Sequence, residues 1–340
     1  MTMKYRKLGK WGLKISELSI GTMYHGSFIK KDASHEILKT AFDQGINHID
    51  CADRYGIYDS ELPIEERRRS EIVLGEFLKD YDRQDLVISS KIWYQMNSKN
   101  VNSGGLHRKH LREGLANSLK YLQTDYLDIY YCHRLDKSTP LEETILTMSN
   151  FIDEGLINYW GTSFWPSNLV ERTIWLAKSL GAHPPSVEQP PYHMNVRNIE
   201  TPEGLLDVVK YHGLGLITFE ALATGLFTEK YADFILNSDN SPPEGSRYNV
   251  VYKNELSDSA RERYSEILPD LLNLAKEHEL PLHHLALAWT LRLDEVTSSL
   301  IGSSKAEQVV DNCKALEVTI SKELENEIEK ILKNKPEKYF

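Results

Sequence analysis

The chain has 340 residues, of which 41% are hydrophobic and 26% charged, as is typical of a globular protein, and its formal net charge is −10. An acidic chain without a clustered Lys/Arg stretch is a poor candidate for binding nucleic acid or an anionic membrane surface. The N-terminal stretch lacks the apolar core of a secretory signal, and no window approaches the roughly 18 apolar residues of a membrane span. The three cysteines, Cys51, Cys132 and Cys313, show no CxxC spacing. We therefore expect a cytoplasmic protein without a disulfide framework or zinc site.

Short β-rich apolar runs alternate with longer helical patterns along the chain. The predicted strands cover residues 15–21, 46–50, 86–91, 126–133, 157–163, 186–189, 214–220 and 296–302. The predicted helices cover residues 34–44, 70–79, 109–122, 141–154, 168–180, 203–211, 257–277, 283–291, 305–313 and 321–332, the last two after the eighth strand. This alternation predicts a parallel sheet of the α/β class. Eight repeats favour a closed (β/α)8 TIM barrel, formed by residues 1–340 as one domain, over an open doubly wound sheet.

Two segments lie outside the repeats. Residues 5–16 have the pattern of a β-hairpin that precedes the first barrel strand and could close the barrel floor. Residues 225–258 are rich in Asn, Ser, Pro and Gly, and they separate the seventh strand from the eighth. A loop of this length in a compact domain usually has a function, and we expect it to lie over the barrel mouth.

Ionisable residues follow the ends of three successive predicted strands. Asp50 ends the second strand and Tyr55 follows in its loop, whereas Lys91 ends the third and His133 the fourth. Each residue alone has an ordinary explanation, such as a turn cap or a core histidine. Together they point to one cavity, because the C-terminal ends of barrel strands converge and buried Lys and Asp are rare unless paired. We interpret the four as a catalytic set.

These residue types indicate proton transfer. A phenol has a pKa of about 10, and a nearby ammonium favours the phenolate. We therefore expect Lys91, kept charged by Asp50, to lower the pKa of Tyr55 toward neutrality. General acid catalysis of this kind contributes about 10²–10⁴ in rate. His133 could hold a substrate oxygen facing Tyr55. The set contains neither an obvious nucleophile nor a metal cage, so the hydride must come from a cofactor.

A candidate phosphate site follows the eighth strand. The helix predicted to begin near Lys305 offers backbone N–H groups beside Ser303 and Ser304, and such helix N-termini bind phosphate. Further along this helix, adenine or ribose could be held by Gln308, Asp311 and Asn312. An ordinary serine-capped helix is the alternative interpretation of this stretch.

Several separated motifs resemble the aldo-keto reductase superfamily. They are "HIDCADRYG", "SSKIW", "YYCHRLD" and "IGSSKAEQVVDN", and the resemblance extends from Tyr5 to about Leu332. The stretches "SGGLHRKHLREGLANSLKYLQTDYLDIYY", "TPLEET" and "YWGTSFW" are similar to one subgroup in particular. It contains the voltage-gated potassium channel β subunits and the bacterial glyceraldehyde-3-phosphate reductases.

The resemblance implies a TIM barrel that reduces aldehydes or ketones to alcohols with NADPH bound across the barrel mouth. Small reactive aldehydes such as glyceraldehyde 3-phosphate or methylglyoxal would be the substrates, and Tyr55 would be the general acid of a tetrad with Asp50, Lys91 and His133. Ser163 and Gln189 would hold the nicotinamide amide, Phe219 would stack on the ring, and Arg247 would close over the cofactor. The implied cofactor-binding residues are Gly21, Thr22, Met23, Asp50, Ser163, Gln189, Phe219, Glu220, Ala221, Leu222, Gly225, Lys230, Arg247, Gly302, Ser304, Gln308, Asp311 and Asn312. Tyr24, His25, Trp93 and Phe164 would contact the substrate.

Some positions depart from the family pattern. Channel β subunits have asparagine where this chain has His133, and the histidine favours a working reductase. Glu220 and Ala221 replace the usual Ser-Pro, and the carboxylate would repel a pyrophosphate. Gln308 stands where many members have an arginine for the 2′-phosphate, so NADP(H) is expected, with NAD(H) as the less favoured alternative. Phe164 replaces a residue that is often basic in the channel-type relatives.

Two other functions are alternatives to a reductase. The first is an NADPH-binding, redox-sensing regulatory subunit of a partner protein. The second is a metal-dependent hydrolase, which would need an HxH or carboxylate cluster at the strand ends. No such cluster is present there, and the pair His283-His284 falls in a predicted helix away from that rim. Relatives of the subgroup form rings while many other members are monomers, so a homo-oligomer is one option.

Overall fold

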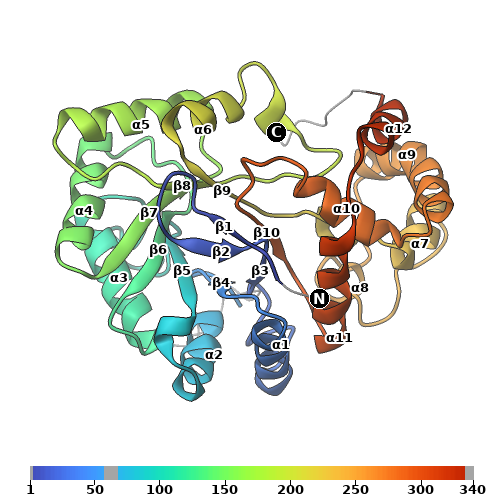
Figure 1. Cartoon of the computed structure of the whole chain (residues 1–340). Helices are drawn as coiled ribbons and strands as arrows, with labels where there is room; N and C mark the ends of the chain where they lie inside the picture. The colour runs from blue at the N-terminus through green and yellow to red at the C-terminus, as the bar shows by residue number, and fades with distance from the viewer. Residues whose placement is uncertain (1–2, 57–67, 334–340) are drawn as a thin grey trace.

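The computed structural model describes residues 3–56 and 68–333. Parallel strands close into a barrel in the order β10-β3-β4-β5-β6-β7-β8-β9, around which the helices form a ring (Figure 1). The barrel strands are β3 Leu18–Gly21, β4 His48–Asp50, β5 Val87–Ile92, β6 Leu127–Cys132, β7 Ile157–Ser163, β8 Val187–Gln189, β9 Gly215–Thr218 and β10 Ser298–Ile301. The predicted (β/α)8 TIM barrel is confirmed.

The helices cover the outside of the barrel with one apolar face each. In α1 (Lys31–Asp43), for example, Ile37, Leu38 and Ala41 are buried in the core that lies between sheet and helices. The other helices of the ring are α2 Arg69–Phe77, α3 Arg108–Leu122, α4 Leu141–Asp153, α5 Ser167–Ser179, α6 Leu206–His212, α9 Asp258–Glu277, α10 Leu282–Thr290, α11 Ala306–Cys313 and α12 Lys322–Leu332. The helix predicted from residue 34 starts earlier, at Lys31, because Ser34 continues the first turn by donating its N–H to Lys30 O.

The predicted N-terminal hairpin closes the floor of the barrel. Strands β1 (Tyr5–Lys7) and β2 (Lys14–Ser16) pair antiparallel and lie across the barrel end in Figure 1. Leu8 and Ile15 are 0% exposed, because they pack into the barrel interior with residues such as Ile129. The turn lies so close to the start of β9 that a Cβ on Gly9 would come within 2.3 Å of Gly213 O. Among the described residues, the hairpin therefore covers this end of the barrel interior.

Residues 225–258, predicted as a long loop, contain two short helices, α7 (Ala232–Leu236) and α8 (Arg247–Val250). Aromatic rings hold the segment together, with the Tyr231 and Phe234 centroids 5.2 and 5.6 Å from that of Tyr248. These aromatic contacts could not be predicted from the mainly polar composition of the segment. The segment reaches the loop after β3, where the guanidinium of Arg247 lies 4.6 Å from the centre of the Tyr24 ring.

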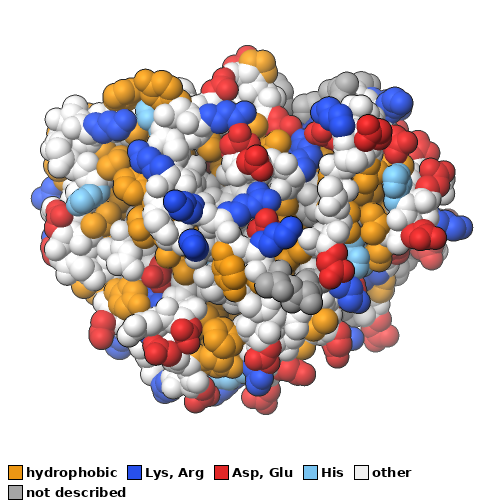
Figure 2. Space-filling model, viewed as in Figure 1, with side chains coloured by type: hydrophobic (Ala, Val, Ile, Leu, Met, Phe, Trp, Pro, Cys, Tyr) orange, Lys and Arg blue, Asp and Glu red, His pale blue; other side chains and the backbone are white. Residues whose placement is uncertain are grey.

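The surface on the hairpin side carries both signs of charge. Figure 2 shows Lys and Arg side chains gathered around the hairpin at the centre of this face, with a few Asp and Glu side chains among them and more toward the lower and right edges. Within residues 3–56 and 68–333, no helix combines the length and the apolar character that a membrane crossing requires.

Candidate active site

Neighbouring parallel strands bring the predicted catalytic set to one end of the barrel. Asp50 is the last residue of β4, Lys91 is the second-to-last residue of β5, and His133 directly follows β6. Their registers are fixed by the pairs Asp50↔Ser89 and Lys91↔Tyr131. Tyr55 lies in the turn after β4, where its N–H donates to Ala52 O at 3.1 Å. Strands that are far apart in sequence thus bring the four side chains together.

The Lys91 ammonium connects this set. Its side chain is 0% exposed, and Nζ donates to Asp50 Oδ2, to Cys51 O at 2.9 Å and to Tyr55 OH at 3.0 Å. All three ammonium protons therefore have acceptors. Burial alone would lower the pKa of Lys91, but the charge of Asp50 and the Tyr55 oxygen outweigh it and raise that pKa. The lysine stays charged beside the phenol.

The acidity of Tyr55 differs from the sequence-based expectation. Burial raises its pKa to about 12, and the opposing attraction of Lys91 only offsets part of this effect. The prediction that Lys91 brings the pKa toward neutrality is therefore wrong for this state of the protein, because desolvation outweighs the ammonium. At neutral pH the phenol is protonated, which is the form that a general acid needs.

His133 forms the facing wall of the cavity as a neutral imidazole. Burial lowers its pKa well below the usual range, and the charges of Lys91, Arg134 and Arg54 lower it further. Its ring meets that of Tyr55 edge-on, with the centroids 5.8 Å apart. Its buried Nδ1 has no hydrogen-bond partner in the part of the chain that the structure describes. A neutral imidazole can donate one hydrogen bond to a substrate oxygen.

A second layer of polar groups fixes the Asp50 carboxylate. Oδ1 accepts hydrogen bonds from Ser89 Oγ at 2.6 Å and Gln189 Nε2 at 3.1 Å. Ser163 Oγ donates to Gln189 O at 3.0 Å, and Thr22 Oγ1 donates to Asp50 O at 2.9 Å. The predicted cofactor residues Ser163, Gln189 and Thr22 therefore adjoin the set. Ser89 was missed, although it lies two residues before Lys91, on the same face of the strand.

Glu188, beside Gln189 in β8, is a buried carboxyl at the same end of the barrel. Oε1 accepts the Trp165 N–H at 3.0 Å, and Oε2 accepts the Thr162 hydroxyl. Burial nevertheless raises its pKa to about 7. Because the unfolded chain releases this proton near pH 4.5, the folded state binds more protons between about pH 4.5 and 7. The contribution of Glu188 to stability therefore falls as pH rises through this window.

We expect Glu188→Gln to gain stability relative to the wild type as pH rises. Glutamine can accept from Trp165 and donate to Thr162 without carrying a charge. The difference in unfolding free energy should move in favour of the variant by about 1–3 kcal/mol between pH 5 and 8. Chemical denaturation at both pH values measures it, with the exposed Glu262→Gln as the matched control. A difference that does not depend on pH would contradict the assignment.

The stretch between β10 and α11 has the features of a nucleotide phosphate site. A Cβ on Gly302 would meet no atom within 4 Å, so the space beside this residue is open. Ser303 Oγ is buried without a hydrogen-bond partner among the described residues. Ser304 N donates to Gln308 Oε1 at 2.8 Å. Asp311 turns instead to His283, whose Nε2 lies 2.7 Å from Oδ2, and Asn312 is buried.

Residues after β9 continue along the barrel mouth toward Arg247. Phe219 is half-buried, whereas Glu220 adopts a left-handed backbone with φ of 64°. Burial alone would lower the pKa of Arg247, but Tyr24, Tyr252 and the charge of Glu220 raise it. Glu220, which departs from the family pattern, thus faces a compensating cation. The remaining predicted residues here are the buried Ala221, the half-buried Leu222 and Gly225, and the exposed Lys230.

The predicted substrate residues divide into two groups. Tyr24, Trp93 and Phe164 are half-buried, and the Arg134 guanidinium lies 5.5 Å from the centre of the Phe164 ring. Met23, which follows Gly21 and Thr22 at the end of β3, is exposed. His25 differs, because it is 0% exposed and neither ring nitrogen has a hydrogen-bond partner among the described residues. Its predicted contact with the substrate stays a prediction.

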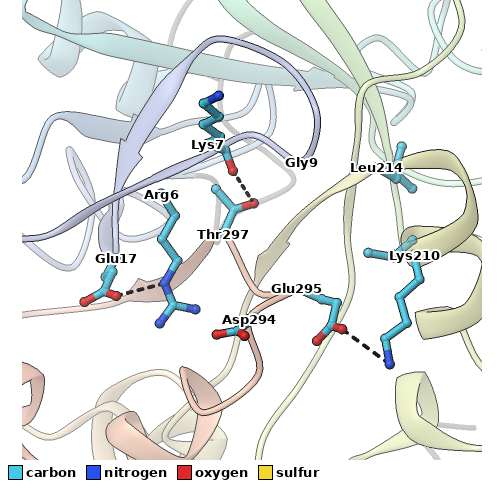
Figure 3. A pocket seen from close by; sticks show the side chains of 11 residues that line it. Arg6, Lys7, Gly9, Glu17, Lys210, Leu214, Asp294, Glu295 and Thr297 are labelled. Atoms are coloured by element: carbon cyan, nitrogen blue, oxygen red, sulfur yellow. Dashed lines mark hydrogen bonds and ion pairs between the residues drawn. The ribbon is translucent and has the colours of Figure 1, made fainter.

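A cavity of about 580 Å³ lies at the opposite end of the barrel (Figure 3). The hairpin and the residues that precede β9 and β10 line it. Its charged groups largely neutralise one another, since Arg6 pairs with Glu17 at 2.8 Å and Lys210 with Glu295 at 3.3 Å. Active sites of TIM barrels lie at the C-terminal ends of the strands. The tetrad end is therefore the candidate active site.

Known proteins place this barrel in a family. Residues 17–333 match the aldo/keto reductase family. The chain is 33% identical over 341 residues to a probable voltage-gated potassium channel subunit beta of Oryza sativa subsp. japonica, covering 99% of this chain and 98% of the relative. A protein of Arabidopsis thaliana with the same name is 34% identical over 343 residues, with coverage of 99% and 98%. The chain belongs to the aldo/keto reductase family.

Proposed function

We propose that this protein reduces small aldehydes or ketones to alcohols with NADPH. The observation that carries the proposal is the hydrogen bond of 3.0 Å between the Lys91 ammonium and the Tyr55 hydroxyl, beside the neutral His133. A protonated phenol held against a buried cation can give up its proton to an oxygen that becomes negative. Small reactive aldehydes such as glyceraldehyde 3-phosphate or methylglyoxal are the proposed substrates.

The residues at the barrel mouth fit a dinucleotide. The open space at Gly302 and the buried, unpartnered Ser303 hydroxyl suit a phosphate group at the start of α11, and Arg247 offers a cation on the other side. Ser163 and Gln189 would hold the nicotinamide amide, and Phe219 would lie against the ring. A reduced nicotinamide supplies a hydride when bound. We propose NADP(H) in preference to NAD(H).

The four residues of the tetrad would together transfer a proton to the carbonyl oxygen. His133 and Tyr55 orient the carbonyl oxygen by donating hydrogen bonds to it. As the carbonyl carbon gains a hydride and the C=O π bond breaks, the oxygen takes the Tyr55 proton and the product is the alcohol. Lys91 stabilises the phenolate that remains, and Asp50 holds Lys91 in place. Uptake of one proton from water by the phenolate would restore the acid.

Turnover with a panel of aldehydes tests the proposal. Mixing the purified protein with NADPH and small aldehydes should lower the absorbance of the reduced nicotinamide, and a parallel fluorescence titration should give tighter binding of NADPH than of NADH. Equal affinity for the two nucleotides would contradict the NADP(H) preference alone. Absence of turnover with every carbonyl, despite nucleotide binding, would contradict the reductase.

A redox-sensing regulatory subunit is the second candidate function. The relatives named as channel β subunits favour it. In that case the chain would bind NADPH tightly, turn over slowly and contact a partner protein. His133 argues for catalysis, because its neutral ring is placed to hold a substrate oxygen.

The cysteines support a reducing compartment. Cys51, Cys132 and Cys313 all lie in the described part of the chain, where they are buried and free of disulfides. Burial raises the pKa of Cys51 to about 12 and that of Cys313 to about 11, so these thiols stay protonated at neutral pH. We propose the cytoplasm as the location, because unpaired cysteines are usual there.

A further inference from the structure

A cluster of two imidazoles and one carboxylate lies outside the catalytic set, where α10 meets α11. His283 and His284 are in the first turn of α10, and Asp311 is in α11. One ligand atom from each residue can be chosen so that all three lie within 4.8 Å of one another. His283 Nε2 lies 2.7 Å from Asp311 Oδ2, and His284 Nε2 lies 3.5 Å from Asp311 Oδ1. The cluster thus converges on one point.

The ring nitrogen Nε2 of His284 supports the binding of a cation in this cluster. The His284 side chain is only 7% exposed, and its Nε2 lies 3.5 Å from Asp311 Oδ1 without a hydrogen-bond partner among the described residues. An imidazole nitrogen that is buried without a partner normally costs stability. A cation between His284 Nε2 and the carboxylate would satisfy this nitrogen.

The geometry suits a transition-metal ion. Two ligands of a tetrahedral zinc ion, each about 2.0–2.1 Å from the metal, lie roughly 3.3 Å apart. Asp311 Oδ2 lies 2.7 Å from His283 Nε2 and Oδ1 lies 3.5 Å from His284 Nε2, and one ligand atom from each residue falls within 4.8 Å of the others, so small side-chain shifts would bring the three around one ion. Imidazole and carboxylate are ligands of zinc and of the other late first-row ions, whereas magnesium and calcium prefer oxygen alone.

Two charged residues next to the cluster, Glu229 and Lys314, are compatible with metal binding. Glu229 Oε2 lies 3.7 Å from Nδ1 of His283, the nitrogen that faces away from Asp311. A carboxylate on that side favours a proton on Nδ1 and leaves Nε2 to bind a metal. Lys314 Nζ lies 3.0 Å from Asp311 Oδ1 and neutralises the carboxylate when no metal is bound. Its side chain is more than half exposed, so it can move aside.

We propose that His283, His284 and Asp311 form a binding site for Zn²⁺ or a similar divalent transition-metal ion that joins α10 to α11. The ion replaces the proton shared by His283 and Asp311, and water takes the fourth position. The metal-dependent hydrolase considered from the sequence would need ligands at the strand ends, whereas this cluster lies on two helices. Metal binding here does not depend on the proposed reductase activity.

Calorimetric titration of the chelator-treated, nucleotide-free protein with Zn²⁺ tests the site. We expect binding of one ion per chain, and titration with Co²⁺ should give the visible absorption of a four-coordinate ion. His283→Gln and His284→Gln should each weaken binding about tenfold or more, since changes even in the residues around a metal site cost about 10–100-fold. Circular dichroism should show that both variants remain folded.

The matched control is His278→Gln. His278 also pairs with a carboxylate, Glu327 at 3.2 Å, but it lies at the end of α9 outside the cluster. Its substitution should leave Zn²⁺ affinity unchanged. The proposal is overturned if Zn²⁺ does not bind stoichiometrically, if both cluster variants bind as tightly as the wild type, or if His278→Gln weakens binding equally. Because no nucleotide or substrate is present, a failed reductase assay leaves this result unaffected.

Discussion

Replacing Tyr55 with phenylalanine is expected to lower the rate of carbonyl reduction by about 10²–10⁴-fold, the usual contribution of a general acid. Phenylalanine keeps the edge-on ring contact with His133 but removes the hydroxyl that lies 3.0 Å from Lys91 Nζ. NADPH affinity should change little, because the lost atom faces the carbonyl oxygen. Initial rates from nicotinamide absorbance, together with nucleotide titration, separate the two effects.

Tyr94→Phe is the matched control for this substitution. The Tyr94 ring also contacts His133, with centroids 5.2 Å apart, so the variant tests whether any lost hydroxyl in the cavity has the same effect. We expect it to keep most of the activity. The role of Tyr55 as the acid would be refuted by near-wild-type turnover in Tyr55→Phe, or by an equal loss in Tyr94→Phe.

Lys91→Met is expected to lower the unfolding free energy by about 3–5 kcal/mol and to abolish turnover. The substitution leaves the carboxylate of Asp50, which is 1% exposed, buried without its counter-ion. Removing one partner of a buried ion pair typically has an effect of this size. Lys39→Met removes a lysine from an exposed pair with Asp43, and it should leave the unfolding free energy nearly unchanged. Chemical denaturation measures both variants.

A double substitution separates the structural role of this pair from its catalytic role. Lys91→Met combined with Asp50→Asn removes both charges, and asparagine can still accept the hydrogen bond from Ser89. The double variant should regain part of the stability lost in Lys91→Met while remaining inactive. A double variant that is less stable than Lys91→Met would show that charge pairing is not the cause. Recovery of turnover would show that Lys91 is dispensable for catalysis.

The position of the tetrad followed from the sequence because it depends on topology. Once strand–helix repeats indicate a parallel barrel, every strand must end at the same rim, so Asp50, Lys91 and His133 had to converge. The strand and helix ranges were predicted to within a few residues for the same reason, since apolar runs and helix periodicity are local signals. The strand predicted to begin at Ile15 joined two elements, because Ile15 and Ser16 belong to β2 of the hairpin and β3 begins at Leu18. The prediction for β9 ran two residues past Thr218, because the apolar Phe219 follows the strand.

Properties that depend on burial and on side-chain direction could not be predicted in this way. The pKa of Tyr55 reflects the competition between desolvation and Lys91, and a sequence does not show how deeply a loop residue is buried. The complete burial of the His25 side chain could not be predicted for the same reason. Asp311 was predicted to bind the nucleotide, and the structure also places its carboxylate 2.7 Å from His283. This contact depends on how α10 packs against α11, which cannot be derived from a sequence motif.

The depth of the thiols has a chemical consequence for the proposed reductase. Reactive aldehydes are electrophiles, and thiolates are the nucleophiles that they most readily modify. Because Cys51, Cys132 and Cys313 are 0 to 1% exposed, the protein offers its proposed substrates no accessible thiol. Such an enzyme would resist alkylation of its thiols, and it would keep working at aldehyde concentrations that inactivate proteins with exposed cysteines.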